Sequence, residues 1–197
     1  MKELLERYPA LKCCKDDISA ALELMINTYK NGGKVLVCGN GGSAADSEHI
    51  VGELMKGFLL KRPVTDERIP EHLRCRLQGS LPAISLPSQA AILSAFINDV
   101  DPETMYAQLV LGYANENDLV IGLSTSGNSK NVVAAVEVAN AKGAKTIAMT
   151  GERDSKLSEI STVTIKVPSC ETYKIQEYHL PVYHYLCAGT EAAFFEE

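Results

Sequence analysis

Two loops rich in glycine, serine and asparagine carry the residue types best suited to bind an anion. The first loop follows the apolar run 35–38 and reads Asn40, Gly41, Gly42 and Ser43. The second loop follows the apolar run 119–123 and contains the hydroxyls of Ser124, Thr125, Ser126 and Ser129. Glycine lets the backbone approach a ligand closely, and hydroxyls and N–H groups at a helix N-terminus donate hydrogen bonds to it. A tight turn also needs glycine, but only one hydroxyl is needed to cap the next helix. Together the loops predict a phosphorylated ligand.

A histidine and a glutamate lie four residues apart, downstream of the first loop. On a helix that begins near Ser43, His49 and Glu53 share one face, so the pair can bind a metal ion or transfer protons. The same spacing also arises by chance on an exposed polar face. Glu48 lies on a different side of that helix and is the weaker partner.

Further polar residues interrupt the apolar positions of a helix predicted over residues 172–195. They are Gln176, His179 and His184. Gln176 and His184 are about 12 Å apart along a straight helix. They can therefore contact one ligand only if the helix bends at Pro181, where a kink is expected, or if neighbouring chains each contribute one of the two side chains. Either histidine taken alone is more often structural than catalytic.

Short, continuously apolar segments predict the strands that position these residues. They are the segments 34–37, 83–86, 119–123, 146–149 and 163–167. Continuous apolar runs indicate a sheet covered on both faces, and helical patterns occur at 43–58, 88–97, 102–115 and 131–142. An N-terminal helix capped by Asp16 or Asp17 ends at Gly32. The pattern predicts an α/β fold, a doubly wound three-layer sandwich with a mainly parallel five-stranded sheet, which binds ligands at the carboxyl ends of its strands.

Length and composition limit the class of protein. The 197 residues are expected to form a single domain, 1–197, with an irregular excursion over 59–81 that acts as a lid or an oligomer contact. A net charge of −6 without a basic cluster argues against nucleic acid as a partner. No apolar run is long enough for a membrane span, and no signal peptide is expected. The six scattered cysteines indicate free thiols and a cytoplasmic location.

The motifs taken together resemble the SIS (sugar isomerase) domain, and within it the phosphoheptose isomerases, from Asp17 onwards. The resemblance rests on Cys38-Gly39-Asn40-Gly41-Gly42-Ser43, His49 with Glu53-Leu54, Asn98-Asp99, Ser124-Thr125-Ser126-Gly127-Asn128-Ser129, and Ile175-Gln176-Glu177 followed by His184. The two Gly/Ser loops in this order are highly specific for that family. The resemblance implies the conversion of sedoheptulose 7-phosphate to D-glycero-D-manno-heptose 7-phosphate through an enediol.

The resemblance also implies a role for each matching residue. Ser43, Ser124, Thr125, Ser126 and Ser129 fall where such enzymes bind the sugar phosphate, and Asn40, Gly41, Gly42, Asn98, Asp99 and Gln176 match further substrate-binding positions. Glu53 and His184 match the acid/base pair. Some members bind zinc through residues that match His49, Glu53, Gln176 and His184. Members are usually homotetramers with active sites at subunit interfaces, which would account for the separation of Gln176 from His184.

The chain departs from the phosphoheptose isomerase pattern in two motifs and in the segment 61–79, which is longer than usual, and this leaves open another sugar phosphate as substrate. Lys56-Gly57-Phe58 stands where the group typically has Gly-Arg-aromatic, and Tyr173 stands where an aspartate is common. A second alternative is a non-catalytic SIS protein of the replication-initiator-associated type, which acts through protein contacts. Glu53 together with His184 argues against that alternative.

A dinucleotide-dependent oxidoreductase is a third alternative. The residues Gly39-x-Gly41-x-x-Ala44 formally match the G-x-G-x-x-A motif. That motif requires an acidic residue after the next strand, where this chain has Pro87-Ser88-Gln89. No nucleotide cofactor is therefore expected.

Overall fold

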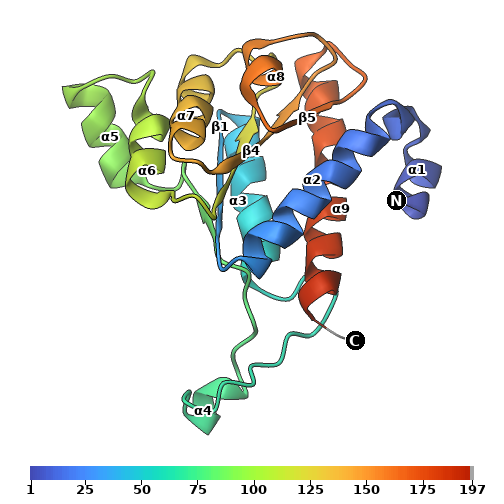
Figure 1. Cartoon of the computed structure of the whole chain (residues 1–197), viewed down its shortest axis with the longest axis vertical. Coiled ribbons are helices and arrows are strands. Elements are labelled where there is room, and N and C mark those ends of the chain that lie inside the picture. Colours follow the sequence, from blue (N-terminus) through green and yellow to red (C-terminus); the bar gives the residue numbers. More distant parts are fainter. Residues whose placement is uncertain (196–197) are drawn as a thin grey trace.

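A five-stranded parallel β-sheet forms the centre of the computed structural model, which describes residues 1–195 (Figure 1). The strands are β1 (Val35–Gly39), β2 (Ala83–Ser85), β3 (Leu119–Leu123), β4 (Lys145–Thr150) and β5 (Val163–Lys166). They lie in the order β2-β1-β3-β4-β5, and every neighbouring pair is parallel. The five predicted strands and the predicted fold class are confirmed.

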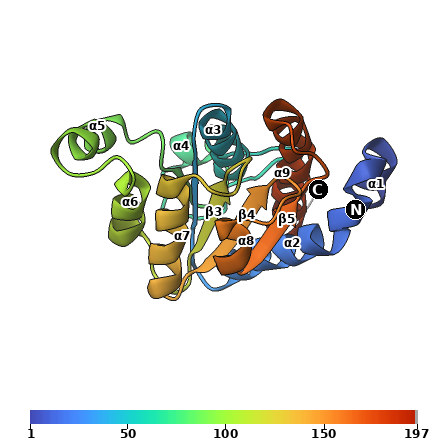
Figure 2. The same ribbon diagram turned by 90° about the horizontal axis from the view of Figure 1, so that it is seen from above.

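Helices cover both faces of this sheet (Figure 2). One face carries α1 (Lys2–Arg7), the 3-10 helix η1 (Pro9–Cys14), α2 (Lys15–Lys30), α3 (Gly42–Met55) and α9 (Thr172–Phe194). The other face carries α6 (Met105–Tyr113), α7 (Lys130–Ala141) and α8 (Lys156–Ile160), and α5 (Ala90–Asp99) is attached beside α6. The result is a three-layer sandwich.

The two apolar cores explain why the strands are continuously apolar. Every residue of β1 is buried, and Val35 and Val37 join the core under α2, α3 and α9. Leu36 and Cys38 point to the opposite face and join the core under α6 and α7. Successive side chains of a strand alternate between faces, so a strand covered on both faces needs apolar residues at every position.

The structure corrects the predicted helix boundaries. The helix predicted to reach Phe58 ends at Met55, because Lys56 takes an extended backbone conformation. The helix predicted to begin at residue 102 begins at Met105. Asp16 and Asp17 do not cap α2 but occupy its first turn, where a carboxylate interacts favourably with the helix dipole.

The excursion over residues 59–81 protrudes from the domain as an arm (Figure 1). The arm contains the short helix α4 (Glu71–Arg74), and an antiparallel bridge between Pro63 and Gln78 closes its base. Leu59, Leu73 and Leu77 are exposed on it. The excursion is therefore an ordered projection with apolar side chains facing solvent.

A buried histidine in α9 links the stability of the fold to pH. His179 is fully buried, its Nε2 lies 3.4 Å from the carbonyl oxygen of Thr150, and its Nδ1 has no hydrogen-bond partner in residues 1–195. Burial lowers the pKa of His179 from 6.5 to about 4. The unfolded chain therefore binds this proton more readily than the folded chain. The stability that His179 contributes is complete above its unfolded pKa and is lost as the pH falls toward 4.

We expect the free energy of unfolding to fall between pH 7 and pH 4 by about 3 kcal/mol more in the wild type than in a His179→Gln variant. Urea denaturation followed by circular dichroism at several pH values measures both slopes. Equal slopes for the two proteins would contradict the prediction.

Candidate active site

The two Gly/Ser loops meet at the point where the strand order of the sheet reverses. β1 and β3 are neighbours in the sheet, with Gly39 paired with Leu123, but the chain continues from them to opposite edges. In doubly wound sheets the crevice at such a point, outside the carboxyl ends of the strands, is where ligands bind. The loops that follow β1 and β3 both lie at this crevice.

Polar contacts hold the first loop against its surroundings. The side-chain amides of Asn40 and Asn131 exchange two hydrogen bonds of 2.9 Å, which join the first loop to the start of α7. The hydroxyl of Tyr106 donates to the carbonyl oxygen of Gly39 at 2.8 Å. Gly41 has a φ of +56°, which favours glycine, and Ser43 is buried in the first turn of α3.

The hydroxyls of the second loop make hydrogen bonds within the loop. The Oγ atoms of Ser124 and Ser129 are 2.9 Å apart, and Ser126 Oγ accepts a hydrogen bond from the N–H of Asn128. Ser129 occupies the N-cap position of α7 without making a side-chain capping bond. Gly127 has a φ of +67°, and a Cβ there would lie 2.0 Å from the hydroxyl of Ser155. Only glycine therefore fits at this position.

A cavity of about 210 Å³ opens beside the second loop. The side chains of Thr125 and Ser126 line one side of it, and residues from the loops after β4 and β5 line the other. Arg153 is the one basic residue in its lining, and its Nε donates to Cys170 Sγ at 3.1 Å. The sequence interpretation missed Arg153, because no motif singles it out. The lining thus combines hydroxyls and one arginine with the carboxylates of Glu152 and Asp154.

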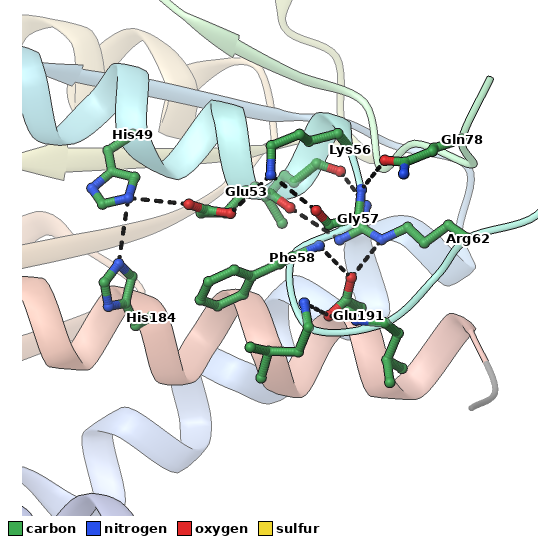
Figure 3. A network of polar contacts seen from close by, with 12 residues as sticks. His49, Glu53, Lys56, Gly57, Phe58, Arg62, Gln78, His184 and Glu191 are labelled. Carbon is green, nitrogen blue, oxygen red and sulfur yellow. Dashed lines mark hydrogen bonds and ion pairs between the residues drawn. The ribbon is translucent and has the colours of Figure 1, made fainter. Parts of the chain in front are cut away.

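A glutamate and two histidines form a polar cluster between α3 and α9 (Figure 3). His49 Nε2 lies 3.1 Å from Glu53 Oε1 and 3.4 Å from His184 Nε2. The predicted shared face of His49 and Glu53 is confirmed. The side chain of Glu53 is only 14% exposed, whereas that of His49 is 43% exposed. The fold thus places a largely buried carboxylate beside two imidazoles that open toward solvent.

This cluster is equipped to exchange protons with a ligand. Burial, and then the neighbouring His49, lowers the pKa of His184, so that its imidazole is neutral at pH 7. Glu53 Oε2 is buried without a hydrogen-bond partner in the described chain, and the nearest cation, Lys56 Nζ, is 3.6 Å away. A carboxylate with a free oxygen and a neutral imidazole are suited to general acid/base catalysis.

Gln176 and His184 meet different parts of α3, because α9 packs alongside that helix. A Cβ on Gly42 would lie 2.7 Å from Gln176 Nε2, so the glutamine side chain covers the start of α3. His184 instead contacts His49 further along α3. A single chain therefore places Gln176 next to the first loop and His184 in the cluster.

Within residues 1–195, Asn98 and Asp99 make no side-chain hydrogen bond to any other candidate residue. They are exposed at the end of α5, where Asn98 Nδ2 donates to Asp99 Oδ1 at 2.7 Å. Figures 1 and 2 both show α5 at one edge of the molecule, with α7 between it and α9. The chain by itself does not bring this pair to the crevice.

A buried ion pair lies beside the cluster, next to the end of α3 (Figure 3). Arg62 Nε donates to Glu191 Oε1 at 2.7 Å, and both side chains have no exposed surface. Arg62 also donates to the carbonyl oxygens of Glu53 and Leu54, at the end of α3. The sequence interpretation missed this pair, whose members are 129 residues apart.

The part of the chain that the structure describes contains no group of three or more His, Cys, Asp or Glu residues that could hold a metal ion. Among the described helices none has the length and apolarity needed to cross a membrane.

The fold and the site define an α/β enzyme domain of the sugar isomerase type. Residues 1–151 match the model of the SIS domain family. The phosphoheptose isomerase of Akkermansia muciniphila is 35% identical over 192 residues, which cover 98% of this chain and 93% of the relative. The phosphoheptose isomerase of Helicobacter pylori (strain P12) is 38% identical over 197 residues, which cover 98% of this chain and 94% of the relative. The chain belongs to the SIS domain family and, within it, to the phosphoheptose isomerases.

Solved structures agree with this assignment. The structure of a phosphoheptose isomerase from Neisseria gonorrhoeae gives a TM-score of 0.76 at 31% identity, covering 95% of this chain and 93% of that one. The structure of a phosphoheptose isomerase from Francisella tularensis gives a TM-score of 0.80 at 30% identity, covering 94% of this chain and 91% of that one. The protein is an isomerase.

Proposed function

We propose that this isomerase converts sedoheptulose 7-phosphate to D-glycero-D-manno-heptose 7-phosphate through an enediol. The observation that carries this proposal is the free, buried oxygen of Glu53 beside the imidazoles of His49 and His184. The substrate class is supported by the relatives, which are named phosphoheptose isomerases. The whole chain, 1–197, is proposed to form one SIS domain.

Glu53 and His184 divide the proton transfers of this reaction. Glu53 removes the proton from C1 of the ketose and returns it to C2, which turns the carbonyl at C2 into a hydroxyl and forms the aldehyde at C1. His184 moves the accompanying proton between the two oxygens. A carboxylate shielded from water suits transfer at carbon, and an imidazole that is neutral at pH 7 suits transfer at oxygen.

The phosphate of the substrate is proposed to bind at the two loops. The residues proposed to hold it are Asn40, Gly41, Gly42, Ser43, Ser124, Thr125, Ser126 and Ser129. Gln176 lies between these loops and the cluster along α9, so it is proposed to contact the sugar. Arg153 in the adjoining cavity supplies a positive charge to the same end of the substrate.

An Arg153→Gln variant is expected to raise KM for sedoheptulose 7-phosphate about tenfold with little change in kcat. The reason is that one charge-assisted hydrogen bond from a partly exposed arginine contributes about 1.4 kcal/mol to binding. Initial rates at varied substrate concentration measure both constants. Arg76→Gln, an exposed arginine on the arm, is the matched control. A KM within twofold of the wild type would exclude Arg153 from the binding site.

The active enzyme is proposed to be a homotetramer in which Asn98 and Asp99 of one copy complete the site of another. Ile92, Ile97 and Val100 are exposed on and beside α5, as expected of a helix that packs against a second chain. A cavity of about 630 Å³ between α1 and α9, lined in part by Leu59, Leu180 and His184, supports an interface at the cluster. The arm over 59–81 is proposed to be a further contact. Sedimentation equilibrium tests the four-chain mass.

The zinc site that the resemblance implies has suitable donor atoms but no assembled geometry. Imidazole nitrogens and carboxylate oxygens are ligands that Zn²⁺ accepts, where it acts as a Lewis acid on substrate oxygens. Gln176, however, lies against Gly42, whereas His49, Glu53 and His184 form a line of contacts centred on His49 Nε2. Zinc binding would therefore require these side chains to rotate, and the steps proposed above use no metal.

A cytoplasmic location is proposed for this isomerase.

Proton NMR of the purified protein with sedoheptulose 7-phosphate in D2O tests the reaction. The expected result is the signal of an aldoheptose phosphate, with deuterium incorporated at C2. Absence of turnover together with protection from thermal unfolding by the same compound would contradict the proposed reaction and would favour another sugar phosphate or a non-catalytic role.

A further inference from the structure

Tyr183 and Asp46 lie outside the proposed acid/base pair of Glu53 and His184 and are linked to it through His49. The hydroxyl of Tyr183, on α9, lies 2.9 Å from His49 Nδ1 and donates to Asp46 Oδ1 at 3.1 Å. Tyr183 is 1% exposed, although the next residue in the chain, His184, belongs to the cluster. The three side chains of Asp46, Tyr183 and His49 form a hydrogen-bonded line that ends at Glu53.

The direction of these hydrogen bonds follows from the number of protons available. A phenol has one proton, and the Tyr183 hydroxyl donates it to the carboxylate of Asp46. Its oxygen can then only accept from His49, so the proton of the His49 ring must sit on Nδ1. Burial keeps Tyr183 a neutral phenol by raising its pKa.

The contact with Tyr183 decides which ring nitrogen of His49 faces the cluster. Because Nδ1 lies against the Tyr183 hydroxyl, Nε2 is the nitrogen that faces Glu53 Oε1 at 3.1 Å and His184 Nε2 at 3.4 Å. His49 therefore presents Nε2 at the place where the substrate is proposed to react.

We propose that Tyr183 and Asp46 are positioning residues that hold His49 with Nδ1 protonated and with Nε2 aimed at Glu53 and His184. This inference rests on the proposed roles of Glu53 and His184. Removing such a supporting hydrogen bond from a functional histidine typically costs 10- to 100-fold in activity. A Tyr183→Phe variant keeps the buried ring but cannot accept from His49.

Nitrogen-15 NMR of histidine-labelled protein and steady-state kinetics test the proposal together. The wild type is expected to show a His49 ring with protonated Nδ1, assigned by comparison with a His49→Asn variant. In Tyr183→Phe this signature is lost, and kcat for sedoheptulose 7-phosphate falls 10- to 100-fold while KM stays within twofold. Asp46→Ala is expected to behave in the same way, whereas Asp46→Asn, which keeps an acceptor oxygen, recovers most of kcat.

Tyr178→Phe is the matched control, because Tyr178 lies on the same helix and its hydroxyl makes no hydrogen bond within residues 1–195. A His49 ring without a proton on Nδ1 in the wild type would overturn the proposal. So would a Tyr183→Phe variant that loses thermal stability but keeps the His49 signature and kcat. If the wild type does not turn over sedoheptulose 7-phosphate, the NMR result still decides the inference, since it is independent of the reaction.

Discussion

A Glu53→Gln variant is expected to lose about 10³-fold in kcat for sedoheptulose 7-phosphate while it remains folded. The amide has the shape of the carboxylate but cannot accept a proton from carbon. Glu53 offers a buried oxygen without a hydrogen-bond donor, which is the atom proposed to take the proton. Proton NMR in D2O follows both product formation and deuterium exchange at the reacting carbons, so it reports the transfer at carbon directly.

Glu48→Gln is the control for this variant. Glu48 lies on the same helix, is exposed, and accepts a hydrogen bond from Ser88 Oγ at 2.9 Å, away from the cluster. It is expected to keep wild-type activity. A Glu53→Gln variant that retains more than about a tenth of the wild-type rate would refute the proposed role, since general acid/base groups contribute about 10²–10⁴-fold.

The Glu191→Ala variant is expected to lose about 3–5 kcal/mol of stability. The substitution leaves the guanidinium of Arg62 buried without a counter-charge. It also removes the acceptor for the N–H groups of Phe58, Leu59 and Leu60, which follow α3. Burial raises the pKa of Glu191, but the hydrogen bonds from Phe58, Leu59 and Arg62 outweigh it and hold that pKa below its usual value.

Urea denaturation at pH 7 measures this loss. An Arg62→Met, Glu191→Leu double variant is expected to be more stable than Glu191→Ala, because it leaves no unpaired buried charge. Glu177→Ala, an exposed position on the same helix, serves as the control. A loss below about 1 kcal/mol in Glu191→Ala would show that the pair is not needed for folding. Activity is expected to fall as well, because Arg62 holds the carbonyl of Glu53.

Local patterns in the sequence were sufficient for the sheet and the loops. Continuous apolar runs predicted the five strands because each strand is covered on both faces. The short helices α1, η1 and α8 were missed, since helices of five or six residues show no helical periodicity. One of them, α8, depends on a capping box between Ser155 and Ser158.

By itself the sequence determined which residues share a face and which loops follow which strands. His49 and Glu53 meet because they are one helical turn apart, and the two Gly/Ser loops meet because their strands pair in parallel. Only the tertiary structure decided which distant side chains meet. The packing of α9 on α3 sets His184 against His49, Tyr183 beside Asp46, and Gln176 over Gly42. The physical reason is that periodicity records the buried face of a helix but not the register in which two helices pack.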